Sequence, residues 1–124
     1  MQIADLKPGQ CVLDPGKDLT PYHLIEVVPC SRPHGHEFVT MLSLPRGPYP
    51  GDKKVETAAF HACDGPAGRA MTKAHRDPQK YAIVVFTPNE RAWQFGDRGV
   101  PCFVTSGGDG LLPAGAVLNL PGSK

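Results

Sequence analysis

Long apolar stretches are missing from this chain of 124 residues. No run reaches the roughly 18 apolar residues that a membrane-spanning helix needs, which excludes such a helix within the sequence. The residues after Met1 also lack the apolar core of a signal peptide. If the domain is exported, we expect its targeting or anchoring segment outside this sequence, and contact with a membrane only through that segment.

An excess of charge of one sign is lacking as well. Thirteen basic and 12 acidic residues leave a formal net charge of +1, and the basic residues are spread along the chain. Proteins that bind nucleic acid concentrate positive charge against the phosphates. We therefore expect no nucleic-acid partner.

Patterns of common catalytic sites are also absent. Ser31 and His34 form a Ser-x-x-His pattern without the glycine-flanked turn of a nucleophile elbow. The glycine-rich residues 107–110 lack the lysine and the following helix of a phosphate-binding loop. The acidic residues are too scattered to indicate a pair of catalytic carboxylates. They include Asp5, Asp14, Asp18, Glu26 and Glu37. The sequence predicts no catalytic residue, no cofactor and a protein that is not an enzyme.

Glycine and proline, by contrast, are abundant, with 14 of each. They divide the chain into short elements, which favours a sheet with irregular connections over a helical bundle. The length suits one hydrophobic core. We predict a single domain, residues 1–124, of the α+β class. It should contain a small, mainly antiparallel sheet, one main helix, one short helix and two disulfides.

The four cysteines are far apart in sequence: Cys11, Cys30, Cys63 and Cys102. They form no close Cys-x-x-Cys pair of the kind that zinc sites use. An even number of cysteines in a small glycine- and proline-rich domain favours disulfides, and with them an extracytoplasmic location. Four buried free thiols in a cytosolic protein and a metal site are the alternatives.

Four cysteines allow three pairings. We favour Cys11–Cys30, which would join two early strands. The second disulfide, Cys63–Cys102, would then tie the main helix to a late strand.

Strands are predicted where apolar and β-branched residues gather between turn signals. The predicted strands lie in residues 6–13, 22–28, 37–44, 81–86, 100–105 and 116–120. Alternation in the third strand places Phe38 and Leu42 on one face and Val39 and Met41 on the other. The unbroken apolar run 81–86 is typical of a central strand.

The main helix is predicted to begin at Asp52 as its N-cap and to end at Gly65 and Pro66, with a surface loop over residues 67–79. Its expected buried stripe is Val55, Ala58, Ala59, Ala62 and Cys63. Residues 87–90 have capping-box spacing with Pro88 as the first helical residue, which predicts a short helix that carries Trp93 and ends at Gly96.

Three segments combine cysteine with glycine or proline: residues 7–11 (KPGQC), residues 27–37 (VVPCSRPHGHE) and residues 93–102 (WQFGDRGVPC). In this order they resemble the actinobacterial septum-formation domain family. They are similar to the family's Gly-Asp-Cys start, its Val-Pro-Cys-Ser-x-Pro-His-x-x-Glu motif and its Trp-x-x-Gly-Asp-Arg-x-Val-x-Cys motif. The resemblance spans about residues 6–106. Gln10 replaces an acid that is common in the family, and the tail after residue 110 lacks the usual Thr-Gly-Ser ending.

The resemblance implies an outward-facing domain of the cell envelope, on a chain anchored by a membrane segment or a lipid. It also implies that all four cysteines occupy family positions. The partner would be another envelope protein or a cell-wall component.

His34, His36 and Glu37 form the densest polar cluster. As metal ligands they would suit zinc in a metal-dependent hydrolase. On an extended segment, however, the two histidines share one face and Glu37 lies on the other. The structural alternative is a turn in which His34 bonds main-chain atoms beside a disulfide, and a third reading is a binding surface.

Trp93, Asp97 and Arg98 form a second cluster, in which the indole offers a stacking face to a ligand. The structural alternative packs Trp93 on the Cys63–Cys102 bridge, with Asp97 capping a turn and Arg98 pairing with a carboxylate. The candidate binding surface is Arg32, His34, His36, Glu37, Trp93, Asp97 and Arg98.

We therefore expect a non-catalytic binding or scaffolding domain of the envelope, linked to septum formation or cell division. The hydrolase and a ligand-sensing domain of an anchored signalling protein are the alternatives.

Overall fold

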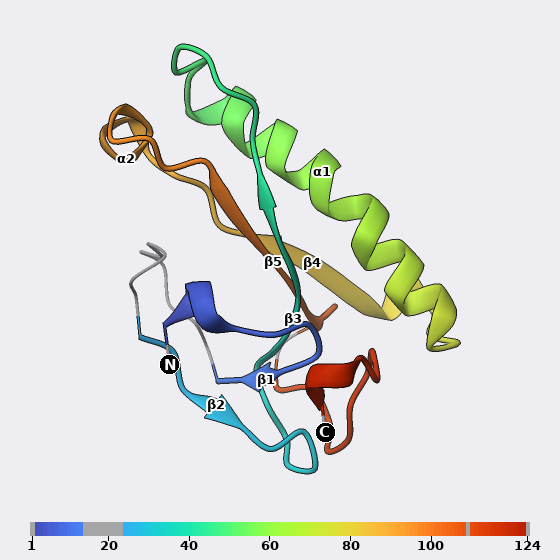
Figure 1. The fold of residues 1–124 in the computed structure, drawn as a ribbon. Helices are drawn as coiled ribbons and strands as arrows, with labels where there is room; N and C mark the ends of the chain where they lie inside the picture. Colours follow the sequence, from blue (N-terminus) through green and yellow to red (C-terminus); the bar gives the residue numbers. More distant parts are fainter. Residues whose placement is uncertain (1, 14–23, 109, 124) are drawn as a thin grey trace.

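The strands form one five-stranded antiparallel sheet in the order β2-β1-β3-β5-β4 (Figure 1). The computed structural model describes residues 2–13, 24–108 and 110–123. The strands are β1 Cys11–Val12, β2 Val27–Val28, β3 His36–Ser43, β4 Tyr81–Val85 and β5 Gly99–Ser106. The predicted α+β fold is therefore confirmed. Of the strand predicted over residues 22–28, only β2 forms, and residues 22 and 23 lie outside the described residues.

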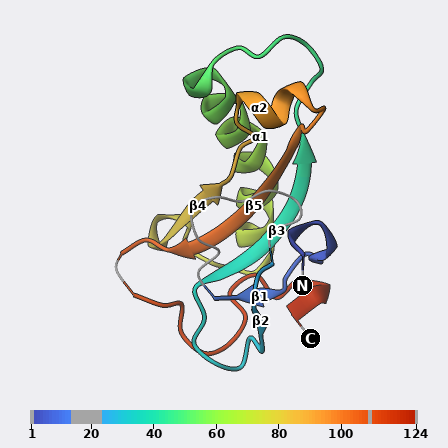
Figure 2. The same ribbon diagram turned by 90° about the vertical axis from the view of Figure 1, so that its left-hand side faces the viewer.

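One face of the sheet packs against helix α1, Asp52–Lys73 (Figures 1 and 2). The buried residues of α1 recur every three to four positions, as a helix with one buried face requires. They are Val55, Ala59, Cys63, Ala67, Ala70 and Met71. The predicted stripe was wrong at Ala58 and Ala62, which are exposed.

The predicted end of this helix was also wrong, because α1 continues through Pro66 to Lys73. Proline has no amide hydrogen for the preceding turn and usually interrupts a helix. Here the turns beyond Pro66 bury Ala67 and Met71 against the sheet, which offsets that cost. Asp52 is the first helical residue and Gly51 occupies the cap position, so the predicted N-cap lies one residue too late.

The opposite face is covered by the N-terminal segment, including the 3₁₀ turn η1, Ile3–Asp5. Its buried cluster is Ile3, Leu6, Val12, Ile25, Phe38 and Phe103. β5 supplies both cores, because Cys102 and Val104 face α1 while Phe103 faces the N-terminal segment. Among the residues that the structure describes, no helix is long and apolar enough to cross a membrane.

A β-bulge changes the alternation of β3. Phe38 pairs with Phe103 and Thr40 with Cys102, so Val39 is an extra residue in β3. Beyond the bulge each side chain changes face, and Leu42 packs on the α1 side while Phe38 packs on the other. The prediction that Phe38 and Leu42 share a face was therefore wrong.

Two further elements differ from the prediction. β4 is an edge strand and not a central one, and all five of its residues are half-buried. The short helix α2, Glu90–Gln94, carries Trp93 as predicted, but its cap is Asn89, whose side chain accepts a hydrogen bond from the amide of Ala92.

Residues 116–120 form no strand, contrary to prediction. They belong to a loop that ends in the 3₁₀ turn η3, Pro121–Ser123. Both predicted disulfides are present, with Cα–Cα distances of 5.3 Å for Cys11–Cys30 and 5.8 Å for Cys63–Cys102.

Candidate functional site

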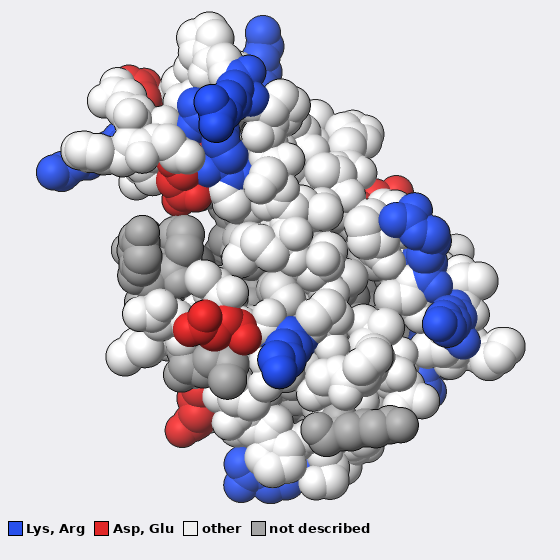
Figure 3. Space-filling view, viewed as in Figure 1, with Lys and Arg blue, Asp and Glu red and all other residues white. Residues whose placement is uncertain are grey.

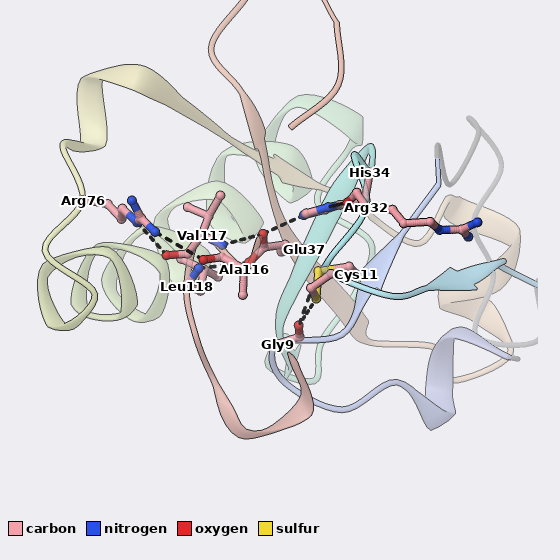
Figure 4. The surroundings of a disulfide bond; sticks show 10 residues. Gly9, Cys11, Arg32, His34, Glu37, Arg76, Ala116, Val117 and Leu118 are labelled. Carbon is pink, nitrogen blue, oxygen red and sulfur yellow. Dashed lines mark hydrogen bonds and ion pairs between the residues drawn. A yellow bond between two sulfur atoms is a disulfide. The ribbon is translucent and has the colours of Figure 1, made fainter. Parts of the chain in front are cut away.

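The polar pair His34 and Glu37 lies entirely inside the protein (Figure 4). His34 comes just before β3 and Glu37 is its second residue. His34 Nε2 lies 2.7 Å from Glu37 Oε2, and both side chains are 0% exposed. Because this hydrogen bond is fully buried, removing either side chain would leave a polar atom of the other without this partner and without water to replace it.

Glu37 also holds the C-terminal loop. Its carboxylate accepts hydrogen bonds from the amide of Val117 at 2.8 Å and from that of Leu118 at 3.0 Å. These two amides are therefore satisfied by a side chain, as buried main-chain groups must be satisfied by some partner. This is why the predicted strand over residues 116–120 does not form.

His34 is held on both sides of its ring. Its Nδ1 donates to the carbonyl of Arg32 at 2.8 Å, and its Nε2 is hydrogen-bonded to Oε2 of Glu37. The main chain of His34 exchanges two hydrogen bonds with Leu112, at 3.1 and 2.7 Å. The structural interpretation, a turn with His34 bonded to main chain, fits these contacts.

We call this region the His–Glu lock, defined as His34, Glu37 and the loop residues 112–118. The disulfide Cys11–Cys30 and Arg76 lie against it. The amide of Gly115 donates to the carbonyl of Cys30 at 2.6 Å. Arg76 donates through Nε to the carbonyl of Val117 at 3.0 Å. The C-terminal loop is thus bonded to the segment 30–37 and to Arg76, both distant from it in sequence.

The His–Glu lock does not fit a metal ion. In the described part of the chain, one group of ligand atoms lies close enough to hold a cation: those of Cys11, His34 and Glu37, within 4.8 Å of one another. Cys11 is in a disulfide and offers no thiolate. Both ring nitrogens of His34 are already bonded.

The expected geometry of the two histidines was wrong. His34 pairs with Glu37, whereas His36 packs edge-on against Phe103, with ring centroids 6.0 Å apart, on the other face of the sheet. His34 lies outside the regular strand, so the two-residue alternation does not extend to it. The three residues of the hydrolase hypothesis are therefore not brought together.

Trp93 anchors the second cluster, at the α2 end of the molecule. It is buried with Cys63 and Cys102 in the α1-side core, and its Nε1 donates to the carbonyl of Gly47 at 2.8 Å. The guanidinium carbon of Arg98 lies 3.6 Å from the centroid of the indole ring. The indole face is thus already occupied by this cation–π contact.

Asp97 and Arg98 hold the turn after α2. Asp97 Oδ1 accepts from the amide of Gly99 at 2.9 Å, so Asp97 caps the turn as expected. Arg98 donates to the carbonyl of Trp93 at 2.7 Å and to that of Asp97 at 3.0 Å. The expected carboxylate partner of Arg98 was wrong, because these acceptors are main-chain carbonyls.

Tyr49 and Asp52 lie close to this cluster. The Tyr49 ring packs edge-on against Trp93 at 5.7 Å, and its hydroxyl donates to the carboxylate of Asp52. This hydrogen bond, with smaller effects of desolvation and nearby acids, raises the pKa of Tyr49 to about 12 from its ordinary value of 10.0. Ionisation would remove the donor and place two negative charges together.

The candidate surface residues are thus separated by the fold. His34, Glu37 and Trp93 are buried, His36, Asp97 and Arg98 are half-buried, and Arg32 is exposed.

Sequence reasoning missed the exposed Phe95, of which 83% is accessible. Phe95 stands two residues after the buried Trp93, and residues at this spacing point to different sides of a helical turn.

It also missed why Gly9 is a glycine. Gly9 has a φ of +98°, and an added Cβ would lie 2.8 Å from Leu120 Cβ. The C-terminal loop therefore lies directly against the first cysteine motif. Positive φ and close approach both favour glycine.

Neither the curated proteins nor the solved structures give a match. The family described as Septum formation matches residues 8–119, which include both disulfides and the His–Glu lock. That match extends over most of the 124 residues, and the chain therefore belongs to the Septum formation family.

Proposed function

We propose that this protein is a non-catalytic binding domain that acts outside the cytoplasm in septum formation, with another envelope protein as its partner. The observation that carries the proposal is that its reactive-looking side chains are used internally. His34 and Glu37 secure the C-terminal loop, and Arg98 covers Trp93. These side chains are therefore engaged within the fold and not free to act on a substrate.

The two disulfides support the extracytoplasmic part of the proposal. Disulfides persist in oxidising compartments and are rare in the cytosol. Both tie segments distant in sequence, with separations of 19 and 39 residues. We further propose that a segment outside this sequence anchors the domain to the membrane directly or through a lipid, in the envelope of an actinobacterium.

The surface we propose for recognition is the α2 end, which presents Phe95. Aromatic side chains exposed on a rigid support are typical anchors of protein interfaces. The support is rigid here because Trp93 is buried and bonded to Gly47. The partner should therefore offer an apolar pocket that accepts an aromatic ring.

A photo-crosslinking amino acid at position 95 tests this surface. Incubated with envelope extract, the oxidised domain should give a discrete crosslinked protein at position 95. An excess of unlabelled domain should suppress this product, and an excess of the Phe95→Ala variant should not. Leu24 is 70% exposed and is distant from Phe95 in the sequence, so a probe at position 24 is the matched control. Equal labelling at positions 95 and 24, or full competition by Phe95→Ala, would contradict the proposal.

A further inference from the structure

The two disulfides lie in different surroundings. Cys63–Cys102 is buried in the α1-side core, and both of its residues are 0% exposed. Cys11–Cys30 lies closer to the surface, because Cys30 is 7% exposed and Cys11 is 1% exposed. A thiolate from outside can cleave a disulfide only when it reaches one of the two sulfur atoms. Of the two bridges, Cys11–Cys30 is therefore the one nearer to such an attack.

A surface hollow of about 530 Å³ lies beside Cys11–Cys30. Both cysteines line it, together with residues of β2, of the turn after β2 and of the C-terminal turn η3. Figure 3 shows acidic and basic side chains in separate places on the face of the molecule seen there, with uncharged surface between them. The residues that line the hollow carry no charge. An approaching thiolate therefore meets no negative side chain among them.

Cys30 stands at the corner of a turn. The amide of Arg32 donates to the carbonyl of Pro29 at 3.1 Å, which makes positions 30 and 31 the central residues of that turn. The neighbours of Cys30 in the turn, Pro29, Ser31 and Arg32, are all exposed. Cys11, by contrast, lies in β1 between β2 and β3. A thiolate that enters the hollow would therefore attack Sγ of Cys30 and release that of Cys11.

Polar groups lie near the sulfur atom that would be released. The carbonyl oxygen of Gly9 lies 3.8 Å from Cys11 Sγ and 3.6 Å from Cys30 Sγ, so the thiols formed by reduction have an acceptor in place. Ligand atoms of His34 and Glu37 also lie within 4.8 Å of Cys11 Sγ. The other bridge is enclosed by the apolar α1-side core, where a released thiolate would cost more free energy.

We propose that Cys11–Cys30 is a redox-active disulfide that exchanges with a dithiol partner through this hollow, while the other bridge stays oxidised. A thiolate of the partner attacks Cys30 Sγ, forms a mixed disulfide and releases Cys11 as a thiolate, which takes up a proton. The partner's second thiolate attacks its own sulfur in the mixed disulfide and releases Cys30, which also takes up a proton. The domain gains two electrons and two protons, and the dithiol becomes a disulfide. This goes beyond the proposed function, because it is a covalent exchange and not recognition at Phe95.

Timed reduction of the oxidised wild type with dithiothreitol tests the proposal. Samples are quenched by alkylation and digested, and mass spectrometry follows each bridge separately. Cys11 and Cys30 should become alkylated at least ten-fold faster than Cys63 and Cys102. If reduction required unfolding of the whole domain, both bridges would open at the same rate. Equal rates, or faster opening of Cys63–Cys102, would overturn the proposal.

A large side chain at the wall of the hollow tests the route of attack. Ser31 lines the hollow, and Ser31→Trp should slow the reduction of Cys11–Cys30 at least five-fold. Ser43 is also exposed but lies at the end of β3 that is far from β1, so Ser43→Trp is the matched control and should be reduced at the wild-type rate. Equal rates for the two tryptophan variants would contradict attack through the hollow.

Single cysteine variants test which sulfur atom is attacked. Cystamine carries a disulfide and should modify Cys30 in Cys11→Ser at least ten-fold faster than it modifies Cys11 in Cys30→Ser. Both variants keep Cys63–Cys102, which still joins α1 to β5. Equal modification of the two variants, or faster modification of Cys11, would overturn the assignment of Cys30 as the attacked residue.

Discussion

At the scale of single residues, the chain uses its most reactive side chains to hold itself together. Glu37 is hydrogen-bonded to His34 and accepts from two loop amides, which uses both carboxylate oxygens in a fully buried setting. When one partner of a buried hydrogen bond is removed, the remaining partner loses that bond and gains none from water in its place.

We predict that Glu37→Gln destabilises the domain by roughly 3 kcal/mol or more. The amide group can accept only through one oxygen, so His34 or a loop amide is left without an acceptor. Thermal and urea unfolding measure the loss, and hydrogen exchange should show faster exchange at Val117 and Leu118. Glu26 is exposed, so Glu26→Gln is the control and should leave stability within about 0.5 kcal/mol of the wild type. A Glu37→Gln variant as stable as this control would contradict the role given to Glu37.

Tyr49 gives a second prediction at this scale. Its pKa of about 12 in the folded protein lies above its ordinary 10.0. The stability that its bond to Asp52 contributes is therefore complete below pH 10 and is lost as pH rises toward 12. Ultraviolet absorbance titration should show a late tyrosine transition that is absent in Tyr49→Phe and shifted down in Asp52→Asn. A late transition that persists in Tyr49→Phe would refute the assignment.

The sequence indicated which polar residues matter here but not what they contact. The spacing of His34, His36 and Glu37 was visible in the sequence. Strand alternation predicted that the two histidines share a face, whereas His34 in fact lies beside Glu37. His34 precedes the regular strand, and its partner loop joins β3 from about 80 positions further along the chain, so no local pattern encodes the contact.

At the scale of elements, local sequence signals predicted most boundaries correctly. They failed where tertiary packing determines where an element ends or which strand it pairs with. β3 and β5 lie within one residue of their predicted ranges, because their apolar patterns are long. Gly65 and Pro66 are strong local stop signals, yet α1 passes through them to bury Ala67 and Met71. The bulge at Val39 and the edge position of β4 depend on pairing partners, which periodicity does not specify.

Pro66 gives the prediction at this scale. Pro66→Ala should stabilise the domain by about 1 to 3 kcal/mol, because the amide of residue 66 can then bond the preceding turn and α1 keeps its buried stripe. Pro78 begins the turn η2, where proline is favourable, so Pro78→Ala should not stabilise. Urea unfolding of both variants provides the comparison. A loss of stability in Pro66→Ala would show that α1 needs a distortion at this position.

At the scale of the whole molecule, two disulfides link the layers. Cys63–Cys102 joins α1 to β5, and Cys11–Cys30 joins β1 to the segment that leads into the His–Glu lock. Loop-closure entropy for 19 and 39 residues corresponds to about 3 and about 4 kcal/mol respectively. Each value is a large part of the 5–15 kcal/mol that stabilises a typical domain.

We predict that Cys63→Ala with Cys102→Ala lowers the free energy of unfolding by about 4 kcal/mol, and the Cys11→Ala with Cys30→Ala pair by about 3. The first pair also sits at the centre of the α1-side core, where both residues are 0% exposed, so smaller side chains add a packing loss. Urea unfolding of each variant, with the oxidised wild type as reference, measures the difference. A variant without Cys63 and Cys102 that is as stable as the wild type would contradict this ranking.

The proposed extracytoplasmic role depends on the cysteines being oxidised in the native protein. Mass spectrometry of the purified domain, alkylated before any reduction and then digested, measures this directly. It should find no alkylated cysteine and two linked peptide pairs, Cys11 with Cys30 and Cys63 with Cys102. Four alkylated cysteines, or any other pairing, would contradict both the fold's covalent framework and the location inferred from it.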